Sequence, residues 1–456
     1  MDKTRIAAQS QCGVPVRLSH SIDAPGVRRS AAAIGTLVVL GCVVACRAAE
    51  KLPEGVTRVA LFRPGDRGYP TFRMEAMVVS PHGTILAFTE GRKGGSGVHG
   101  DVDLLLRRSA DGGRTWGPIQ IAVDNGPNTV CYPTPLVDHQ TGKIWLAMCM
   151  YRAPANQGTI TRGEPPDTCH TWITHSEDDG ASWKPPVEIT RDVKPPGTTW
   201  FAPGAGFGIQ LRSGRLVVPC YHFDDGKEDR FRTHRSSVFY SDDHGKTWRR
   251  GGVVNRYAPG TEVDDSVSVE ERIRISRGWF IPGRTDEAQV IELNDGRLMM
   301  NMRSYHCSYR RAISFSKDGG LTWSAVTLDE KLFEPICSGS IARLSSVRDG
   351  QMRDRIVFAN PNGRVRSGHV FVREKLTVRL SYDEGKSWPV QRVLDPGPAG
   401  NLNAIGLPDG RVGVLYEGGS RQIFRETIYF STCTVNWLTR GRDRGESLKD
   451  TRKRHP

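Results

Sequence analysis

Arginine and glutamate side chains are the residues of this chain whose types and spacing could do chemistry. Arg73, Arg303 and Arg373 stand on widely separated segments, and Glu287 precedes Arg303 by 16 residues. A planar guanidinium donates parallel N–H bonds to a carboxylate, so three arginines brought together would form a strongly positive anchor for one carboxylate group. Taken singly, each arginine is as well explained as a surface or ion-paired side chain. The question is whether the fold brings these segments together.

A repeated motif organises the chain around these residues. Five segments share the pattern Ser-x-Asp-x-Gly-x-Ser/Thr-Trp. The five segments are 109–116, 176–183, 241–248, 316–323 and 381–388. Their first serines are 67, 65, 75 and 65 residues apart, a period that fits a four-stranded sheet with loops better than a helical hairpin. We expect a structural role, with Asp and hydroxyl groups bonding turn backbone and Trp packing between sheets; a calcium or glycan role is the alternative.

Hairpin signals precede these motifs. Gly83 separates the apolar runs 77–79 and 85–87, as expected for two strands joined by a tight turn. Comparable turn glycines are Gly142, Gly214, Gly296, Gly350 and Gly410. Six hairpins accompany five motifs, and the sixth motif has decayed at 430–437. Six four-stranded units account for residues 52–440, so we predict an all-β fold, a six-bladed β-propeller with a central funnel where loops converge.

Motifs of this form on a six-bladed propeller resemble the sialidase (neuraminidase) family over nearly the whole chain after residue 50. Residues 69–75 resemble its Phe/Tyr-Arg-Ile-Pro motif, with Met74 and Glu75 departing from Ile-Pro. Residues 286–303 are similar to its segment with a buried glutamate and, sixteen residues on, the second arginine. The segment 373–381 looks like the site of the third arginine, and 200–209 resembles a glycine-rich loop that shapes the pocket.

The resemblance implies a role for each of these residues. Arg73, Arg303 and Arg373 would grip the carboxylate of the substrate, and Arg92 would line the pocket. Because a carboxylate nucleophile would be repelled by an anionic sugar, the family uses a tyrosine nucleophile, a glutamate that accepts its proton, and an aspartic acid as general acid/base. Glu287 fits the role of the glutamate.

Two positions depart from the family's catalytic pattern. Aligning 100–103 and 407–410 with the family places Val98 at the acid/base position and Asn401 at the nucleophile. His99 or Asp101, in the glycine-rich loop, could supply acid/base function, although His99 could equally be a loop residue with no role. The sequence does not place the tyrosines that could approach the funnel, Tyr305 and Tyr416.

Three functions are consistent with these residues. The first is an exported exo-α-sialidase-like glycoside hydrolase that acts on terminal sialic or other nonulosonic acids of glycoconjugates. The second is a hydrolase or lyase for another acidic sugar, such as a uronic acid, using His99. The third is a carbohydrate-binding pseudoenzyme that kept the anchor and lost the chemistry. We expect no metal and no organic cofactor, because no His/Cys/Asp cluster has ligand spacing.

The charge distribution argues against a nucleic-acid partner. The 456 residues carry a net charge of +13, but seven of these charges lie in the segments 1–46 and 440–456. The rest of the chain has no basic cluster of the kind that neutralises phosphates. The resemblance to sialidases implies sialylated or other acidic glycans as partners.

The N-terminal segment predicts export. Arg28 and Arg29 precede an apolar run at 31–45, about the length of a signal-peptide core and too short to span a membrane. The run ends in small residues before Cys46, which resembles a lipobox; cleavage near residue 48 or 49 is the alternative. We assign 1–49 to an extension and signal peptide, 50–440 to the propeller and 441–456 to a basic disordered tail. The location would be periplasmic, secreted or lipid-anchored at the cell envelope.

Seven cysteines remain after the N-terminal segment, with no Cys-x-x-Cys pair. Their odd number in so large a chain favours buried apolar residues over a disulfide framework or a metal site. They are Cys131, Cys149, Cys169, Cys220, Cys307, Cys337 and Cys433.

Overall fold

The computed structural model describes residues 52–164, 167–224, 234–254, 284–306, 308–363, 365–366, 370–420 and 425–445. One compact unit begins at Leu52. The predicted export segment, Cys307 and residues 446–456 lie outside the described residues. None of the described helices is long and apolar enough to cross a membrane.

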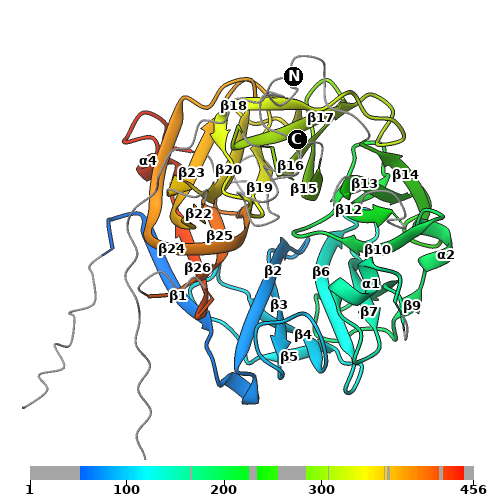
Figure 1. Ribbon diagram of the computed structural model, residues 1–456. Helices are drawn as coiled ribbons and strands as arrows, with labels where there is room; N and C mark the ends of the chain where they lie inside the picture. The colour runs from blue at the N-terminus through cyan, green and yellow to red at the C-terminus, as the bar shows by residue number, and fades with distance from the viewer. Residues whose placement is uncertain are drawn as a thin grey trace, which may run out of the picture. The chain divides into compact units, whose positions relative to one another are not determined.

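The strands form six antiparallel blades around a centre, as predicted (Figure 1). Blade 1 contains β2 (Thr71–Val79), β3 (Ile85–Arg92), β4 (Val102–Ser109) and β5 (Gln120–Val123). Blade 2 contains β6 (Thr129–Val137), β7 (Ile144–Tyr151), β8 (His170–Ser176) and β9 (Val187–Glu188). Blade 3 contains β10 (Thr198–Pro203), β11 (Ile209–Gln210), β12 (Leu216–Asp224), β13 (His234–Ser241) and β14 (Arg249–Val253).

The remaining blades follow the same order from the centre outwards. Blade 4 contains β15 (Thr285–Glu292), β16 (Leu298–Ser304), β17 (Arg310–Ser316) and β18 (Thr327–Phe333). Blade 5 contains β19 (Ser340–Ser345), β20 (Arg355–Pro361) and β23 (Glu374–Ser381), with β21 (Val365–Arg366) and β22 (Val370–Phe371) as a separate hairpin. The long strand β24 (Val390–Gly406) ends blade 5 and begins blade 6, which continues with β25 (Val412–Gly418) and β26 (Thr427–Cys433).

The first strand of the described chain closes the ring. β1 (Val56–Phe62) pairs antiparallel with β26, so the N-terminal strand is the outermost strand of the last blade. This pairing leaves β2 free to begin blade 1. Short helices occupy loops: η1 (Asp66–Gly68), α1 (Gln157–Thr161), α2 (Thr190–Val193), η2 (Val347–Asp349) and α4 (Val435–Leu438).

The repeated motifs form one hydrogen-bonded turn that recurs in five blades. In the first, Ser109 Oγ accepts a bond from the Gly113 amide at 2.9 Å, and Asp111 Oδ1 accepts one from the Thr115 amide at 2.9 Å. In three motifs the Trp packs against an aromatic ring of the preceding blade, as Trp183 does on Phe88. These contacts are those expected of a structural motif.

Hydrophobic side chains fill the spaces between blades, and six cysteines belong to that interior. Cys131, Cys149, Cys169, Cys220, Cys337 and Cys433 are buried with free thiols. The body extends past Arg440: Asp443, which we assigned to the tail, is buried and pairs with Arg355 at 2.8 Å. Residues 441–445 therefore pack as part of the propeller.

Candidate functional site

Four inner strands carry the candidate site residues at β-bulges. Register shifts interrupt β2 between Arg73 and Ala76, β6 between Cys131 and Thr134, β15 between Thr285 and Ala288, and β24 between Ala399 and Leu402. A bulge places two residues opposite one and re-aims their side chains. The bulged residues are Met74, Glu75, Tyr132, Asp286, Glu287 and Asn401.

Arg73 is buried and held from another blade. Its Nε donates to Oε1 of Glu417 at 2.8 Å, and Arg73 is only 9% exposed. Burial lowers the pKa of Arg73, but the carboxylates of Glu417, Glu90 and Glu75 raise it, with a net shift above its ordinary value. Glu417 lies on β25, so blades 1 and 6 meet at this ion pair.

Arg303 has a similar arrangement within blade 4. Its Nη1 donates to Oε2 of Glu287 at 2.7 Å, and its Nε lies 3.6 Å from Oδ1 of Asp286. The guanidinium lies 5.0 Å from the centre of the Tyr305 ring, whose hydroxyl donates to Asp286 at 2.7 Å. The 16-residue interval thus places Glu287 directly on Arg303, because adjacent antiparallel strands bring the two residues together.

Arg373, the third arginine, acts electrostatically on a thiol that Arg303 also influences. Arg373 donates through Nη2 to the carbonyl oxygen of Ile336. Burial raises the pKa of the neighbouring Cys337 thiol to about 11, against the lowering effect of Arg373 and Arg303. The charges of Glu287 and Glu417 act on the Cys337 thiol as well.

A fourth arginine belongs to this cluster and was missed by sequence reasoning. Burial and the charges of Arg73, Arg373 and Arg92 together lower the pKa of Arg425 to about 10, against the raising effect of Glu417. By surface area, however, Arg425 is exposed, which fits a side chain at the rim of the cluster. Because Arg425 follows residues 421–424 without a recognisable motif, nothing in the sequence distinguished it from a loop arginine.

Arg92 is a buried, ion-paired residue. Its Nε donates to Oε2 of Glu90 at 2.8 Å, and Nη1 donates to the carbonyl oxygen of Ser96. The other oxygen of Glu90 accepts the backbone amide of Tyr132 at 2.8 Å. Arg92 therefore orients Glu90, and Glu90 in turn fixes the bulge of β6. The sequence predicted a pocket-lining role for Arg92 but not this contact with Glu90.

Two tyrosines accompany Glu287. Burial raises the pKa of Tyr132 well above its ordinary value, and the charge of Glu287 raises it further. Tyr221 forms a side-chain hydrogen bond with Tyr132, and the two rings meet edge to face at 5.8 Å. Sequence reasoning missed both tyrosines, since they come from blades 2 and 3 and lie in no motif.

Asn401 and Val98 are the residues that we aligned with the nucleophile and the acid/base of the family. Asn401 is 4% exposed; its Nδ2 lies 3.0 Å from Sδ of Met74, and its Oδ1 accepts from the Cys337 thiol at 3.4 Å. Val98 packs against the apolar cluster that contains Met74, Tyr132 and Trp200. The backbone amide of Asn401 also donates to Glu417, the partner of Arg73, at 3.3 Å. Neither the Asn401 nor the Val98 side chain can transfer a proton.

The structure does not bring His99, Asp101 or Tyr416 to the arginine cluster through any described contact. His99 is exposed and forms a β-bridge with Asn156. Asp101 pairs with Lys93 at 2.8 Å. Tyr416 donates to Asp395 at 2.6 Å inside the apolar core, whereas Tyr305, the other tyrosine that we considered, does contact Arg303.

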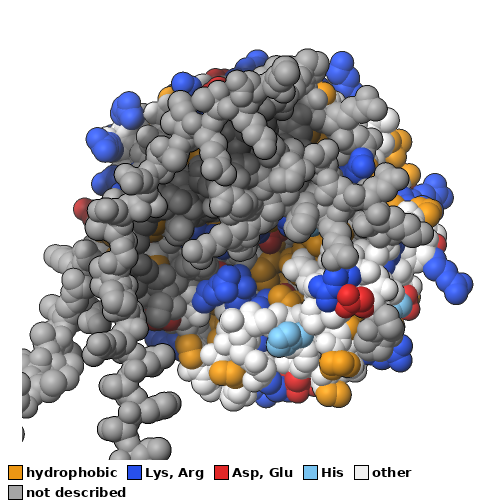
Figure 2. All heavy atoms as spheres, viewed as in Figure 1, with side chains coloured by type: hydrophobic (Ala, Val, Ile, Leu, Met, Phe, Trp, Pro, Cys, Tyr) orange, Lys and Arg blue, Asp and Glu red, His pale blue; other side chains and the backbone are white. Residues whose placement is uncertain are grey.

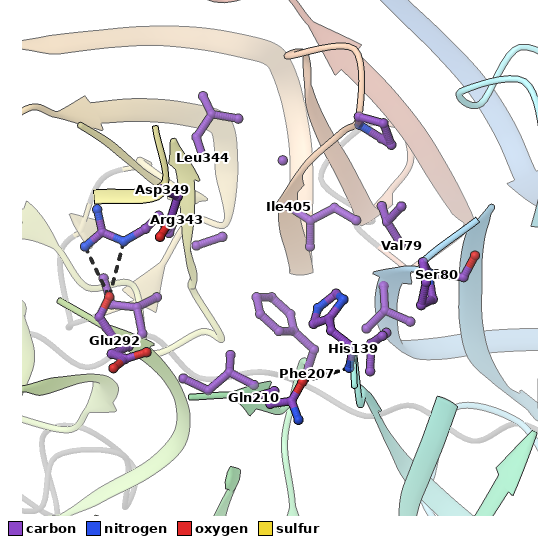
Figure 3. A pocket seen from close by; sticks show the side chains of 18 of the residues that line it. Val79, Ser80, His139, Phe207, Gln210, Glu292, Arg343, Leu344, Asp349 and Ile405 are labelled. Atoms are coloured by element: carbon purple, nitrogen blue, oxygen red, sulfur yellow. Dashed lines mark hydrogen bonds between the residues drawn. The ribbon is translucent and has the colours of Figure 1, made fainter. Parts of the chain in front are cut away.

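A separate cavity of about 650 Å³ is lined by the hairpin turns that join the inner strands to the next strands (Figure 3). Polar groups of its lining bond to one another: Arg343 donates to the carbonyl oxygen of Glu292 at 3.1 Å, and Gln210 accepts the His139 amide at 2.7 Å. Within the described residues, no group of three or more His, Cys, Asp or Glu is placed to hold a metal ion. Figure 2 shows basic side chains beside an apolar recess on the described part of the surface.

Comparison with known proteins decides the family. The model of the BNR repeat-like domain matches residues 83–432. The chain belongs to the family of this BNR repeat-like domain. It is 32% identical over 388 residues to a sialidase of Micromonospora viridifaciens, covering 82% of this chain and 53% of that protein. It is 29% identical to a sialidase of Bacteroides fragilis (strain YCH46), covering 79% and 62%.

A solved structure agrees with the sialidase fold. The Hadza microbial sialidase Hz136 superposes with a TM-score of 0.66 at 26% identity, covering 82% of this chain and 68% of that one. The predicted resemblance and the propeller are thereby confirmed. The chain spans only about half to two-thirds of the length of the two curated sialidases.

Proposed function

We propose that this chain is an exo-α-sialidase-type hydrolase that holds the carboxylate of a terminal sialic or related nonulosonic acid between Arg73, Arg303 and Arg373. The observation that carries the proposal is the ion pairing of Arg73 and Arg303 with carboxylates on separate blades, at 2.8 and 2.7 Å. Guanidinium groups fixed in this way lose little freedom when they bind an anion. The similarity to sialidases supports a sialic acid rather than another acidic sugar.

Glu287 and Tyr132 are the groups that we propose for the covalent step. The Tyr132 phenol would transfer its proton to Glu287 while its oxygen bonds to the anomeric carbon. The bond from that carbon to the departing oxygen breaks with its electron pair, and the oxygen takes a proton from the general acid, for which Asp101 and His99 are the candidates. Water then reverses the sequence and releases the sugar acid.

The anchor is tested by the release of 4-methylumbelliferone from its α-sialoside. We expect Arg303→Ala to lower turnover by about 100-fold or more, because it removes one donor and leaves Glu287 buried without its partner. The matched control is Arg310→Ala, since Arg310 lies on the next strand and pairs only loosely, at 3.8 Å, with the exposed Glu330. If Arg303→Ala folds and keeps wild-type turnover, the anchor assignment is wrong.

A second candidate function is binding without turnover. It is favoured by Asn401, whose amide is fixed between Met74 and Cys337, and by Val98, which packs on apolar side chains. Loss of activity in Tyr132→Phe would support the hydrolase. Absence of turnover in the wild type, together with millimolar or tighter binding of free sialic acid, would support the binding protein.

We also propose that the chain acts outside the cytoplasm on sialylated glycans. The support is the predicted signal segment before residue 50. Expression of the full chain in a bacterial host, followed by fractionation of cytoplasm, periplasm and membranes, tests this proposal, and deletion of 1–49 provides the control.

A further inference from the structure

Glu75 is an unusual carboxyl group within this site. It follows Arg73 by two residues in the bulge of β2, where the sialidase motif that it resembles has proline. Only 3% of the residue is exposed. Among the described residues, neither carboxyl oxygen has a hydrogen-bond partner on another residue, and only its own backbone amide acts on it as a donor.

The arginines that could neutralise Glu75 already have partners. Arg73 donates to Glu417 at 2.8 Å, and Arg303 donates to Glu287 at 2.7 Å. The first ion pair joins β2 to β25, and the second joins β15 to β16. Both arginines are therefore already neutralised by carboxylates other than Glu75. Burying a carboxylate without a partner is unfavourable, so the protonated form is favoured.

The electrostatics agree with this geometry. Burial raises the pKa of Glu75 well above its ordinary value of 4.5, and the charges of Glu417 and Glu287 raise it further. Arg73 and the backbone amide lower it, but less than burial raises it. These are the charged groups that act on Glu75 from its own strand and from β25 and β15.

We infer that Glu75 is the proton-carrying group of this site, and that the site accepts an anionic sugar acid only while Glu75 is neutral. The inference rests on the proposed function, because it concerns the same arginine cluster. A carboxylate ligand adds one negative charge next to Arg73 and Arg303. When Glu75 is protonated, the described carboxylates beside that charge are those already paired with Arg73 and Arg303, whereas an ionised Glu75 would add an unpaired negative charge that repels it. Glu75 thus makes binding dependent on pH.

The test is the dissociation constant of free sialic acid measured by calorimetry from pH 5 to pH 9. For the wild type we expect affinity to fall as pH rises through the folded pKa of Glu75, approaching about tenfold per pH unit above it. Glu75→Gln is neutral at every pH, so we expect its affinity to stay within about threefold across the range. Glu330→Gln, with an 80% exposed side chain, is the matched control and should keep the wild-type profile.

The outcomes separate this inference from the proposed function. A wild-type profile in Glu75→Gln, or a flat profile in the wild type, would overturn the role of Glu75. Absence of sialic acid binding at every pH would instead overturn the proposed function. If Glu75→Gln does not fold, infrared difference spectra of the wild type, recorded while the pH is raised with alkali, test the role of Glu75. We expect a band from a buried protonated carboxyl group that disappears when the group ionises. Saturating sialic acid should keep this band to a higher pH. A band unaffected by sialic acid would contradict the inference.

Discussion

At the scale of single residues, the site is a set of charges in which each buried arginine has a carboxylate. Arg73 with Glu417 and Arg303 with Glu287 are buried pairs, and such pairs are retained for geometry more than for stability. Removing one partner leaves the other charged in a place that water does not reach. The residue that does not fit this pairing is Glu75, which is why the pH response of the site is expected to depend on it.

Asn401→Tyr introduces a tyrosine at the position that we aligned with the nucleophile of the family. Because Asn401 is 4% exposed and its amide lies 3.0 Å from Sδ of Met74, a larger ring would collide there. We expect denaturation with urea to show a loss of about 1–3 kcal/mol in the free energy of unfolding. Adding Met74→Gly should recover part of it, since Met74 has φ 57°, which glycine adopts freely.

Val187→Tyr, at an exposed position, serves as the control for the added ring and should leave stability unchanged. A gain of sialoside hydrolysis in the double variant would show that the rest of the pocket is intact. A stable Asn401→Tyr single variant would contradict the packing that we describe around Asn401.

At the scale of elements, the bulged inner strands carry site residues, and the repeated turns stabilise the blades. The bulges of β2, β6, β15 and β24 present site residues at one end of the inner strands. The Ser-x-Asp turns stabilise the connection between outer strands, away from these bulges. In the fourth motif, for example, Asp318 Oδ1 accepts the Thr322 amide at 2.9 Å and the Leu321 amide at 3.0 Å.

Asp318→Asn tests the contribution of one turn through its pH dependence. Burial raises the pKa of Asp318, but the hydrogen bonds from Thr322, Ser316 and Leu321 together lower it more, to about 2 from an ordinary 3.8. A carboxyl whose folded pKa is lowered stabilises the protein above pH 3.8, and this stabilisation is lost as pH falls toward 2. Because the group is largely exposed, we expect about 1 kcal/mol in the free energy of unfolding.

Urea denaturation between pH 2 and 6 is the measurement, and exposed Asp192→Asn is the control. In the wild type the free energy of unfolding should fall as the pH is lowered. Asp318→Asn should lose part of this fall, and Asp192→Asn should keep it. If the free energy of unfolding of Asp318→Asn falls between pH 6 and pH 2 as much as that of the wild type, the turn does not stabilise the ionised carboxyl.

At the scale of the whole molecule, closure of the ring depends on contacts between the two ends of the chain. β1 pairs with β26, and Phe62 at the end of β1 packs against Phe72 of blade 1, with ring centres 5.6 Å apart. One buried side chain therefore joins the last blade to the first. Asp443 adds a second connection, from beyond α4 to Arg355 in blade 5.

Phe62→Ala is expected to lower the free energy of unfolding by about 3–5 kcal/mol, because Phe62 is fully buried and the space cannot be refilled. Chemical denaturation measures the loss. Val187→Ala, which is 61% exposed, should change it by less than about 0.5 kcal/mol. A small effect of Phe62→Ala would show that the ring is stable without this contact.

Local patterns in the sequence were sufficient for the architecture. Turn glycines, short apolar runs and the five Ser-x-Asp motifs act within one blade, so their number and spacing predict six blades and where each begins. The 16-residue interval from Glu287 to Arg303 was also sufficient, because two adjacent strands of one hairpin bring them together. Membership of the family followed from the same motifs.

The tertiary structure determined which blades supply the carboxylate partners of the buried arginines. Glu417 binds Arg73 across 344 residues, and Asn401 contacts Met74 across 327, distances over which no local rule applies. Likewise, the exposure of His99 and the burial of Arg92 depend on how a loop lies against the neighbouring blade. The sequence alone determined the propeller and most of its anchor, because strand and turn signals are local. Only the fold determined the partners of the anchor and the unpaired state of Glu75, because these depend on the closure of six blades around one axis.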